Sequence, residues 1–131
     1  MEIEETRLPE VLLIRPDIHV DYRGEYVMVY RSGAYPIPCT WREECLSTSK
    51  KGTLRGIHAD FKCDKLISVF HGEIYYVVVD CLKDSPDFGK WQAFILSDHN
   101  RHQVYKPAQY GAGFLALTDD VVFHYKQTEY Y

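Results

Sequence analysis

The sequence contains no apolar stretch near the roughly 20 residues that a membrane-spanning helix needs. Its first ten residues, MEIEETRLPE, are acidic and lack the basic and then apolar order of a secretory signal. Lysine and arginine are scattered instead of forming a run, and the net charge is −4 at pH 7. We therefore expect a cytoplasmic protein that has neither a membrane nor a nucleic acid as its partner.

Several catalytic signatures are missing as well. No C-x-x-C pair occurs among the four cysteines, and a reducing compartment disfavours disulfides, so we interpret them as core or strand residues. They are Cys39, Cys45, Cys63 and Cys81. The sequence has no G-x-S-x-G elbow for a covalent nucleophile and no glycine-rich phosphate loop. Covalent catalysis and nucleotide hydrolysis are therefore disfavoured.

What the sequence has in abundance is β-strand character. Nine runs rich in Tyr, Val, Ile and Phe alternate with turn signals, and no amphipathic helix, internal repeat or linker is evident. In one of them, residues 72–80, alternation gives two largely apolar faces, which predicts a central strand. We expect a single all-β domain over residues 1–131, an antiparallel sandwich or barrel. The runs are 11–16, 25–30, 40–47, 65–72, 73–81, 90–97, 102–106, 113–118 and 121–127.

The histidines do not form a recognisable metal site. Metal-binding β-barrels usually combine a His-x-His pair with a nearby Glu and a distant fourth His. Here His58 is followed by Ala59 and Asp60, and residues 107–114 contain no histidine. The other histidines are isolated, so we expect no metal.

One basic cluster stands out in the segment TLRGIHADFKCDK. It places Arg55, His58 and Lys65 within eleven residues, together with Lys62. From spacing alone, a solvated strand end explains this pattern at least as well as a reactive site. In a regular strand Arg55 and His58 would face opposite sides, but a bulge at Gly56 would let both reach one cavity.

Six ordered segments together resemble the dTDP-4-dehydrorhamnose 3,5-epimerase family of nucleotide-sugar enzymes. The resemblance implies a cupin-like β-barrel or jelly roll, a homodimer, and a reaction that uses no metal and no cofactor. The segments are LLIRP (12–16), DYRG (21–24), STSKKG followed by LRGIH (47–58), KL followed by GE and then VD (within 65–80), SPDFGKW (85–91) and FHYKQTEYY (123–131).

The resemblance also gives the basic cluster a chemical meaning. In this family a base removes a proton beside a keto group, a cation holds the enolate, and an acid returns a proton from the opposite face. His58 matches the base, Tyr125 the acid and Lys65 the cation; histidine, with a usual pKa of about 6.5, suits proton abstraction at neutral pH. Arg55 and Arg23 match arginines that hold the diphosphate. The other implied substrate-binding residues are Glu43, Ser47, Asp60 and Lys126.

The chain also departs from the family pattern. Better-known members are longer and carry, in a C-terminal segment, an aspartate that pairs with the catalytic histidine. We therefore expect either that Asp60 or Asp80 orients His58 in this chain or that His58 is a weaker base. A second acidic position of the family is Tyr76 here, and a family histidine corresponds to Ala112. These changes leave room for epimerisation at one carbon only.

Two further points stay open at this stage. The short segment between His58 and Lys65 is similar to that of epimerases of GDP-linked 4-keto heptoses. Glu43 could accept hydrogen bonds from the N1 and N2 hydrogens of guanine. The expected nucleotide is therefore either GDP or dTDP. The product would serve bacterial surface polysaccharide. The alternatives are a nucleotide-sugar 3,4-ketoisomerase, whose members usually have a His-x-His pair at His58, and a non-catalytic nucleotide-sugar-binding cupin.

Overall fold

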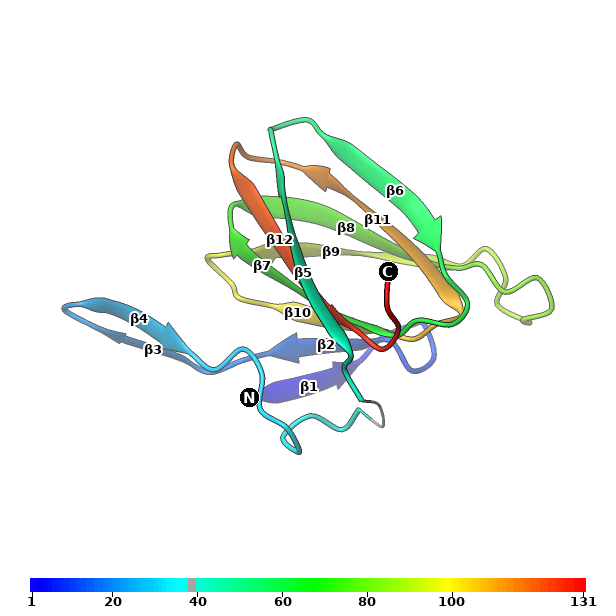
Figure 1. The fold of residues 1–131 in the computed structure, drawn as a ribbon, viewed down its shortest axis with the longest axis horizontal. Helices are drawn as coiled ribbons and strands as arrows, with labels where there is room; N and C mark the ends of the chain where they lie inside the picture. Colours follow the sequence, from blue (N-terminus) through cyan, green and yellow to red (C-terminus); the bar gives the residue numbers. More distant parts are fainter. Residues whose placement is uncertain (38–39) are drawn as a thin grey trace.

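The computed structural model describes residues 1–37 and 40–131. All the regular secondary structure in these residues is β-strand (Figure 1). Two antiparallel sheets pack face to face, in the strand orders β1-β2-β10-β7-β12-β5 and β6-β11-β8-β9, and β3 and β4 form a separate hairpin. This confirms the predicted antiparallel sandwich. The strands are β1 (Glu2–Glu5), β2 (Leu12–Arg15), β3 (Ile18–Asp21), β4 (Gly24–Val27), β5 (Glu43–Ser49), β6 (Leu54–Ala59), β7 (Lys65–His71), β8 (Glu73–Asp80), β9 (Trp91–Ser97), β10 (Gln103–Lys106), β11 (Tyr110–Ala116) and β12 (Val121–Gln127).

Each of the nine predicted runs overlaps a strand, but three strands were not predicted. These are β1, β3 and β6. Their residues are exposed along the whole length of each strand, so no buried face imposes an apolar alternation on the sequence. The missed strand β6 matters most for function, because it carries the predicted base.

The main core lies between the two sheets. In β8, which is central as predicted, Ile74, Tyr76 and Val78 are buried, whereas Tyr75 is 38% exposed on the other face. They pack against inward residues of β7 and β12 such as Ile67. Burying one such side chain stabilises the fold by roughly 1.5 to 3 kcal/mol. The alternation of β8 therefore fixes which face of its sheet meets the core.

A second apolar cluster covers the outer surface of the six-stranded sheet. Tyr35 is 7% exposed and packs there with side chains of β2, β7 and β10. The Tyr35 hydroxyl donates to Gln103 Oε1 at 3.0 Å, and Gln103 Nε2 donates to Ser68 Oγ at 2.8 Å. These bonds satisfy polar groups that would otherwise be buried at a cost. The sheet is thus covered on both faces in this region.

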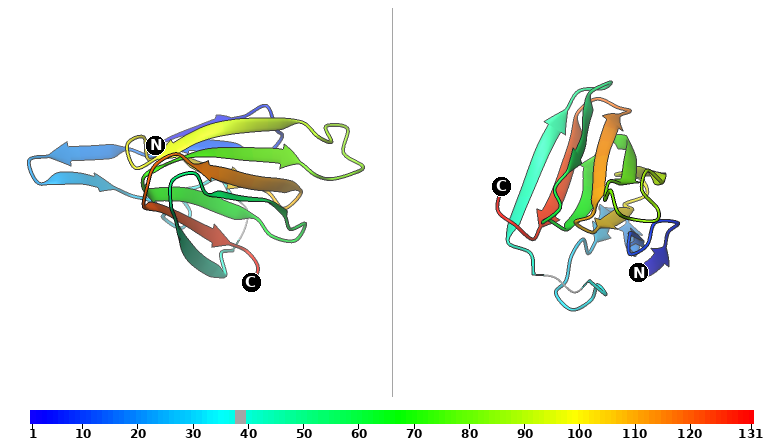
Figure 2. Two further views of the ribbon diagram at one scale, coloured as in Figure 1. Left: turned by 90° about the horizontal axis from the view of Figure 1, so that it is seen from above. Right: turned by 90° about the vertical axis from the view of Figure 1, so that its right-hand side faces the viewer.

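The β3–β4 hairpin extends away from the sandwich (Figure 2). Asp21 pairs with Gly24, so Tyr22 and Arg23 form a two-residue turn, as the sequence predicted for residues 21–24. The Asp21 carboxylate accepts a hydrogen bond from the Arg23 backbone N–H at 2.8 Å and lies 2.6 Å from its guanidinium. Every residue of β3 is exposed.

In the described part of the chain, no helix could span a membrane. Cys45, Cys63 and Cys81 are free thiols. Cys39 lies outside the described residues.

Candidate active site

A pocket of about 440 Å³ opens between the two sheets. Four strands and one loop contribute the predicted site residues that line it. This arrangement brings the predicted base, the predicted acid and two cationic side chains to one cavity. The residues are Ser47 of β5, Arg55 and His58 of β6, Asp60 after β6, Lys65 of β7 and Tyr125 of β12.

The pairing register of the six-stranded sheet builds one wall of the pocket. Lys65 lies opposite Lys106 on one side and Gln127 on the other, and Gln127 lies opposite Glu43. Residues directly opposite each other share a face of the sheet. These four residues therefore form one row across the inner surface, called the inner row below. Tyr125, two residues before Gln127, lies on the same face and one step deeper.

Gly56 explains how Arg55 and His58 reach the same pocket. His58 pairs with Ala112 and Arg55 pairs with Phe114. One residue lies between the two partners on β11, but two lie between Arg55 and His58, so β6 contains one extra residue. Gly56 has φ of +96°, and a Cβ there would lie 2.7 Å from the Ala112 carbonyl oxygen. Only glycine fits this close approach. The bulge hypothesis from the sequence thus agrees with the observed register.

Two hydrogen bonds hold the guanidinium of Arg55 in place. Its Nε donates to Ser49 Oγ at 2.9 Å and its Nη2 donates to the Thr48 carbonyl at 3.0 Å. A guanidinium has five N–H donors, so these two bonds leave donors for an anionic ligand. β5 therefore orients an arginine that β6 carries.

Lys65 and Tyr125 are in direct contact. The Lys65 ammonium lies 4.6 Å from the centre of the Tyr125 ring, a cation–π geometry. Burial raises the pKa of Tyr125 to about 12, and the neighbouring Cys45 thiol and Glu43 carboxylate contribute. Tyr125 therefore keeps its proton at neutral pH, as an acid must before it donates.

The expected aspartate partner of His58 is only partly supported. Asp60 lines the pocket with His58, and its carboxylate accepts the Lys62 backbone N–H at 3.0 Å. Asp80 is buried and bonded elsewhere, to Ser85 Oγ at 2.5 Å in the loop after β8. The interpretation of Asp80 as the group that orients His58 was therefore wrong.

Lys126 and Arg23, two predicted substrate-binding residues, do not line the pocket. Lys126 follows Tyr125 in the same strand and so faces the opposite side of the sheet. There its ammonium lies 3.0 Å from Glu44 and 4.6 Å from the centre of the Tyr30 ring. Arg23 lies at the tip of the projecting hairpin. The chain by itself does not bring either residue to this pocket.

Glu43 belongs to the inner row but does not line the pocket. Its carboxylate accepts hydrogen bonds from Gln127 Nε2 at 2.5 Å and from the Tyr131 backbone N–H at 2.9 Å. These bonds occupy one oxygen, Oε2, and tie the last residue to the edge strand. Glu43 thus lies beside the site and not within it.

The predicted site omitted several residues that line the pocket, among them three polar side chains of the strands. Lys106 ends β10, Gln127 ends β12, and Tyr76 lies in β8. Tyr76 is 2% exposed, and burial raises its pKa far above the usual value, so its hydroxyl stays neutral. Period-2 alternation from Val104, a core residue, would have placed Lys106 on the inner face.

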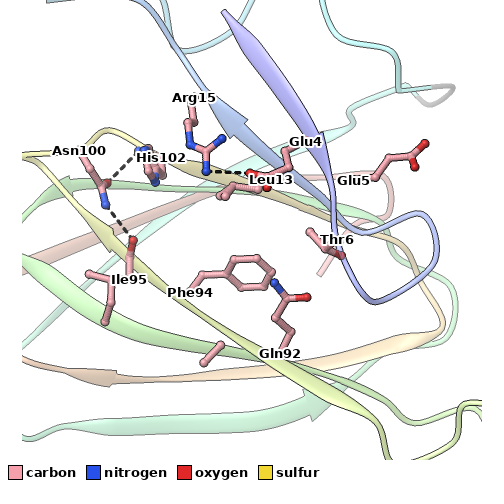
Figure 3. A pocket seen from close by; sticks show the side chains of 11 residues that line it. Glu4, Glu5, Thr6, Leu13, Arg15, Gln92, Phe94, Ile95, Asn100 and His102 are labelled. Carbon is pink, nitrogen blue, oxygen red and sulfur yellow. Dashed lines mark hydrogen bonds and ion pairs between the residues drawn. The ribbon is translucent and has the colours of Figure 1, made fainter.

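A second hollow of about 430 Å³ lies between β1, β2 and β9 (Figure 3). Two contacts join polar groups within it: Arg15 lies 2.7 Å from Glu4, and Asn100 Nδ2 donates to the Ile95 carbonyl at 2.8 Å. The nine predicted site residues, all in the described part of the chain, are absent from its walls. The reactive groups therefore gather in the first pocket.

The fold and the pocket together define the class of protein. Within residues 1–37 and 40–131, no three His, Cys, Asp or Glu side chains are arranged to hold a metal ion. The predicted base and the predicted acid line this pocket from facing sheets of a β-sandwich. The chain belongs to the dTDP-4-dehydrorhamnose 3,5-epimerase family, whose sequence profile matches residues 5–131.

Individual relatives agree with this assignment. The dTDP-4-dehydrorhamnose 3,5-epimerase of Neisseria gonorrhoeae is 38% identical over 136 residues, covering 100% of this chain, and the chain spans only 42% of that relative. RmlC from Legionella pneumophila, solved with dTDP-4-keto-L-rhamnose, superposes with a TM-score of 0.94 at 35% identity over 99% of this chain and 72% of its own. ChmJ from Streptomyces bikiniensis, a 3'-monoepimerase solved with dTDP-quinovose, gives 0.89 at 28% identity over 96% and 67%.

Proposed function

We propose that this protein epimerises a nucleotide-linked 4-keto sugar in deoxysugar or heptose biosynthesis. The main observation that supports this proposal is that His58 and Tyr125 line one pocket from opposite sheets. The keto group acidifies the protons on the neighbouring carbons C3 and C5. His58 removes one of them, and Tyr125 returns a proton to the other face of the sugar, which inverts the carbon.

Lys65 and Arg55 supply the positive charge that this reaction requires. The Lys65 ammonium stabilises the oxyanion of the enolate, which carries full charge only as the proton leaves. Arg55, oriented by Ser49 and Thr48, binds the diphosphate with the donors that remain. We place the reaction in the cytoplasm, since the described free cysteines suit a reducing compartment.

We propose dTDP as the nucleotide, because both solved relatives described above bind dTDP-linked sugars. GDP is the alternative, and it depends on Glu43 as a partner of guanine. Replacing Glu43 by Gln tests this point: GDP binding should weaken selectively if Glu43 contacts guanine. Equal affinity of wild type and Glu43→Gln for GDP would leave dTDP as the nucleotide.

We further propose a homodimer in which Arg23 acts at the partner's site. By family resemblance Arg23 binds the diphosphate, yet it lies on the hairpin outside its own pocket. The hairpin leaves Tyr22 96% and Val20 75% exposed, an apolar surface suited to a second copy. A two-fold interface would supply one Arg23 to each pocket.

The central experiment is deuterium exchange. The protein is incubated in D₂O with GDP- and dTDP-linked 4-keto sugars, and incorporated deuterons are counted by mass spectrometry. Two deuterons indicate exchange at both C3 and C5, and one deuteron indicates a single-site epimerase like ChmJ. Absence of exchange with every substrate, while binding remains measurable, would contradict the proposed function.

A further inference from the structure

We propose that Lys106 is a second cationic catalytic residue, which acts with Lys65 to stabilise the enolate oxygen of the substrate. This inference rests on the proposed function. It concerns a residue that neither the cluster around His58 nor the family resemblance pointed to. The argument comes from its place in the sheet, its burial and the nature of its partners.

The register puts Lys106 beside Lys65. The two residues lie directly opposite each other on β10 and β7, and both line the pocket. Directly opposite residues on one face have Cβ atoms about 4.5 to 5.5 Å apart. An oxyanion within reach of Lys65 is therefore also within reach of Lys106.

Lys106 is buried and, among the described residues, forms no ion pair with a carboxylate. Lys106 is only 3% exposed. In the described chain, the lysine ion pairs are those of Lys90 with Asp87 and of Lys126 with Glu44. A buried ammonium without a counter-ion is costly for the fold. A bound anion would supply the missing charge.

The hydrogen bonds of Lys106 leave one donor for a ligand. Its Nζ donates to the Pro107 carbonyl at 3.1 Å and to the Tyr110 carbonyl at 2.8 Å. An ammonium has three N–H groups, so one remains. The two carbonyls orient the group at the wall of the pocket, as they would for a preorganised oxyanion donor.

The electrostatic surroundings of Lys106 are mixed. Its pKa is lowered to about 8, mainly by burial and then by the Lys65 cation, whereas Cys63, Asp64 and Asp60 oppose the shift. Asp64 is itself engaged by the Tyr105 hydroxyl at 2.9 Å and the Ala108 N–H at 2.8 Å. An anion between the two lysines would relieve their repulsion and favour the charged form of Lys106.

Lys106 has a competing structural role, because it ties the turn between β10 and β11. Two variants separate the roles. Lys106→Gln can still donate hydrogen bonds to the carbonyls but has no charge. Lys106→Met has neither the donors nor the charge. Lys90→Met is the control, since Lys90 is a surface lysine that lies 2.7 Å from Asp87. Thermal melts report stability for all of them.

The test measures kcat and KM by deuterium exchange across pH about 6 to 10. We expect kcat to fall roughly 100-fold in both Lys106 variants, with KM changed much less, and to stay near wild type in Lys90→Met. The wild type should lose activity above pH about 8 as Lys106 deprotonates, and both Lys106 variants should lack this limb.

Three results would overturn the inference. Turnover restored by Lys106→Gln would assign Lys106 a structural role. Wild-type turnover in both Lys106 variants would remove the role while leaving the epimerase function intact. Absence of exchange in the wild type itself would overturn the proposed function and, with it, the role of Lys106.

Discussion

The ammonium of Lys65 lies 4.6 Å from the centre of the Tyr125 ring, so the cation and the acid of the proposed reaction are in contact. Replacing Lys65 by Met should lower kcat by roughly 100-fold, because a preorganised donor at a developing oxyanion typically contributes that much. Steady-state kinetics would check this. Lys90→Met is the control, since Lys90 pairs with Asp87 on the surface. An unchanged kcat in Lys65→Met would remove Lys65 from the mechanism.

His58 and Tyr125 should fail in different ways. His58→Asn should abolish deuterium uptake, because no base then removes the proton. Tyr125→Phe should still take up deuterium from His58 on one face but should not invert the carbon. Mass spectrometry measures the uptake, and NMR of the sugar measures the inversion. Uptake and inversion lost in equal measure in Tyr125→Phe would argue against separate roles.

Gly56→Ala should damage both the fold and the site. Its Cβ would lie 2.7 Å from the Ala112 carbonyl oxygen, on backbone with φ of +96°. We expect a loss of roughly 1 to 3 kcal/mol in unfolding free energy, measured by urea titration. Gly89→Ala is the control, because Gly89 has φ of +85° and no atom within 4 Å of the added Cβ. An equal loss in both variants would show that the close approach to β11 adds nothing.

A dimer that shares Arg23 predicts complementation. Arg23→Ala and His58→Ala should each be inactive, but mixing them after mild dissociation should restore about a quarter of wild-type activity, since half the dimers are hybrids with one intact site. The exchange assay measures the recovery. Mixtures that stay inactive, with subunit exchange verified by mass spectrometry, would confine Arg23 to its own chain.

The lowered pKa of Lys106 has a consequence for stability. Its folded pKa of about 8 lies below the usual 10.5, so between these values the unfolded chain binds more protons and stability rises with pH. The wild type should therefore gain up to about 3 kcal/mol relative to Lys106→Met between pH 8 and 10.5. Urea unfolding at pH 7 and near pH 10 would measure the difference. A constant difference would mean that the pKa is unshifted.

The sequence predicted the elements that have a buried face. β8 and β12 show the alternation that burial imposes, and both were found with nearly correct ends. β6 was not predicted, because all its residues are exposed and two of its side chains, Arg55 and His58, line the pocket. Local pattern therefore describes packing better than it describes a binding surface.

The site was predictable where residues lie close in sequence or carry a family motif. His58, Arg55 and Lys65 were found in this way. Lys106 was missed because its role depends on pairing with Lys65, some forty residues earlier in the chain, and pairing is not visible in a single sequence. Lys126 was predicted for the site but does not line the pocket, because the residue next to Tyr125 in sequence lies on the other face of the strand.

The inner row has a consequence for how this site tolerates change. Lys65, Lys106 and Gln127 line the cavity, with Glu43 beside it, only because β5, β7, β10 and β12 keep their register. Deleting one residue within β7 would turn Lys65 outward and break the row at once. Loop lengths, by contrast, leave the register untouched. Lineages of this protein should therefore accumulate insertions between strands, while the spacing within these four strands stays invariant.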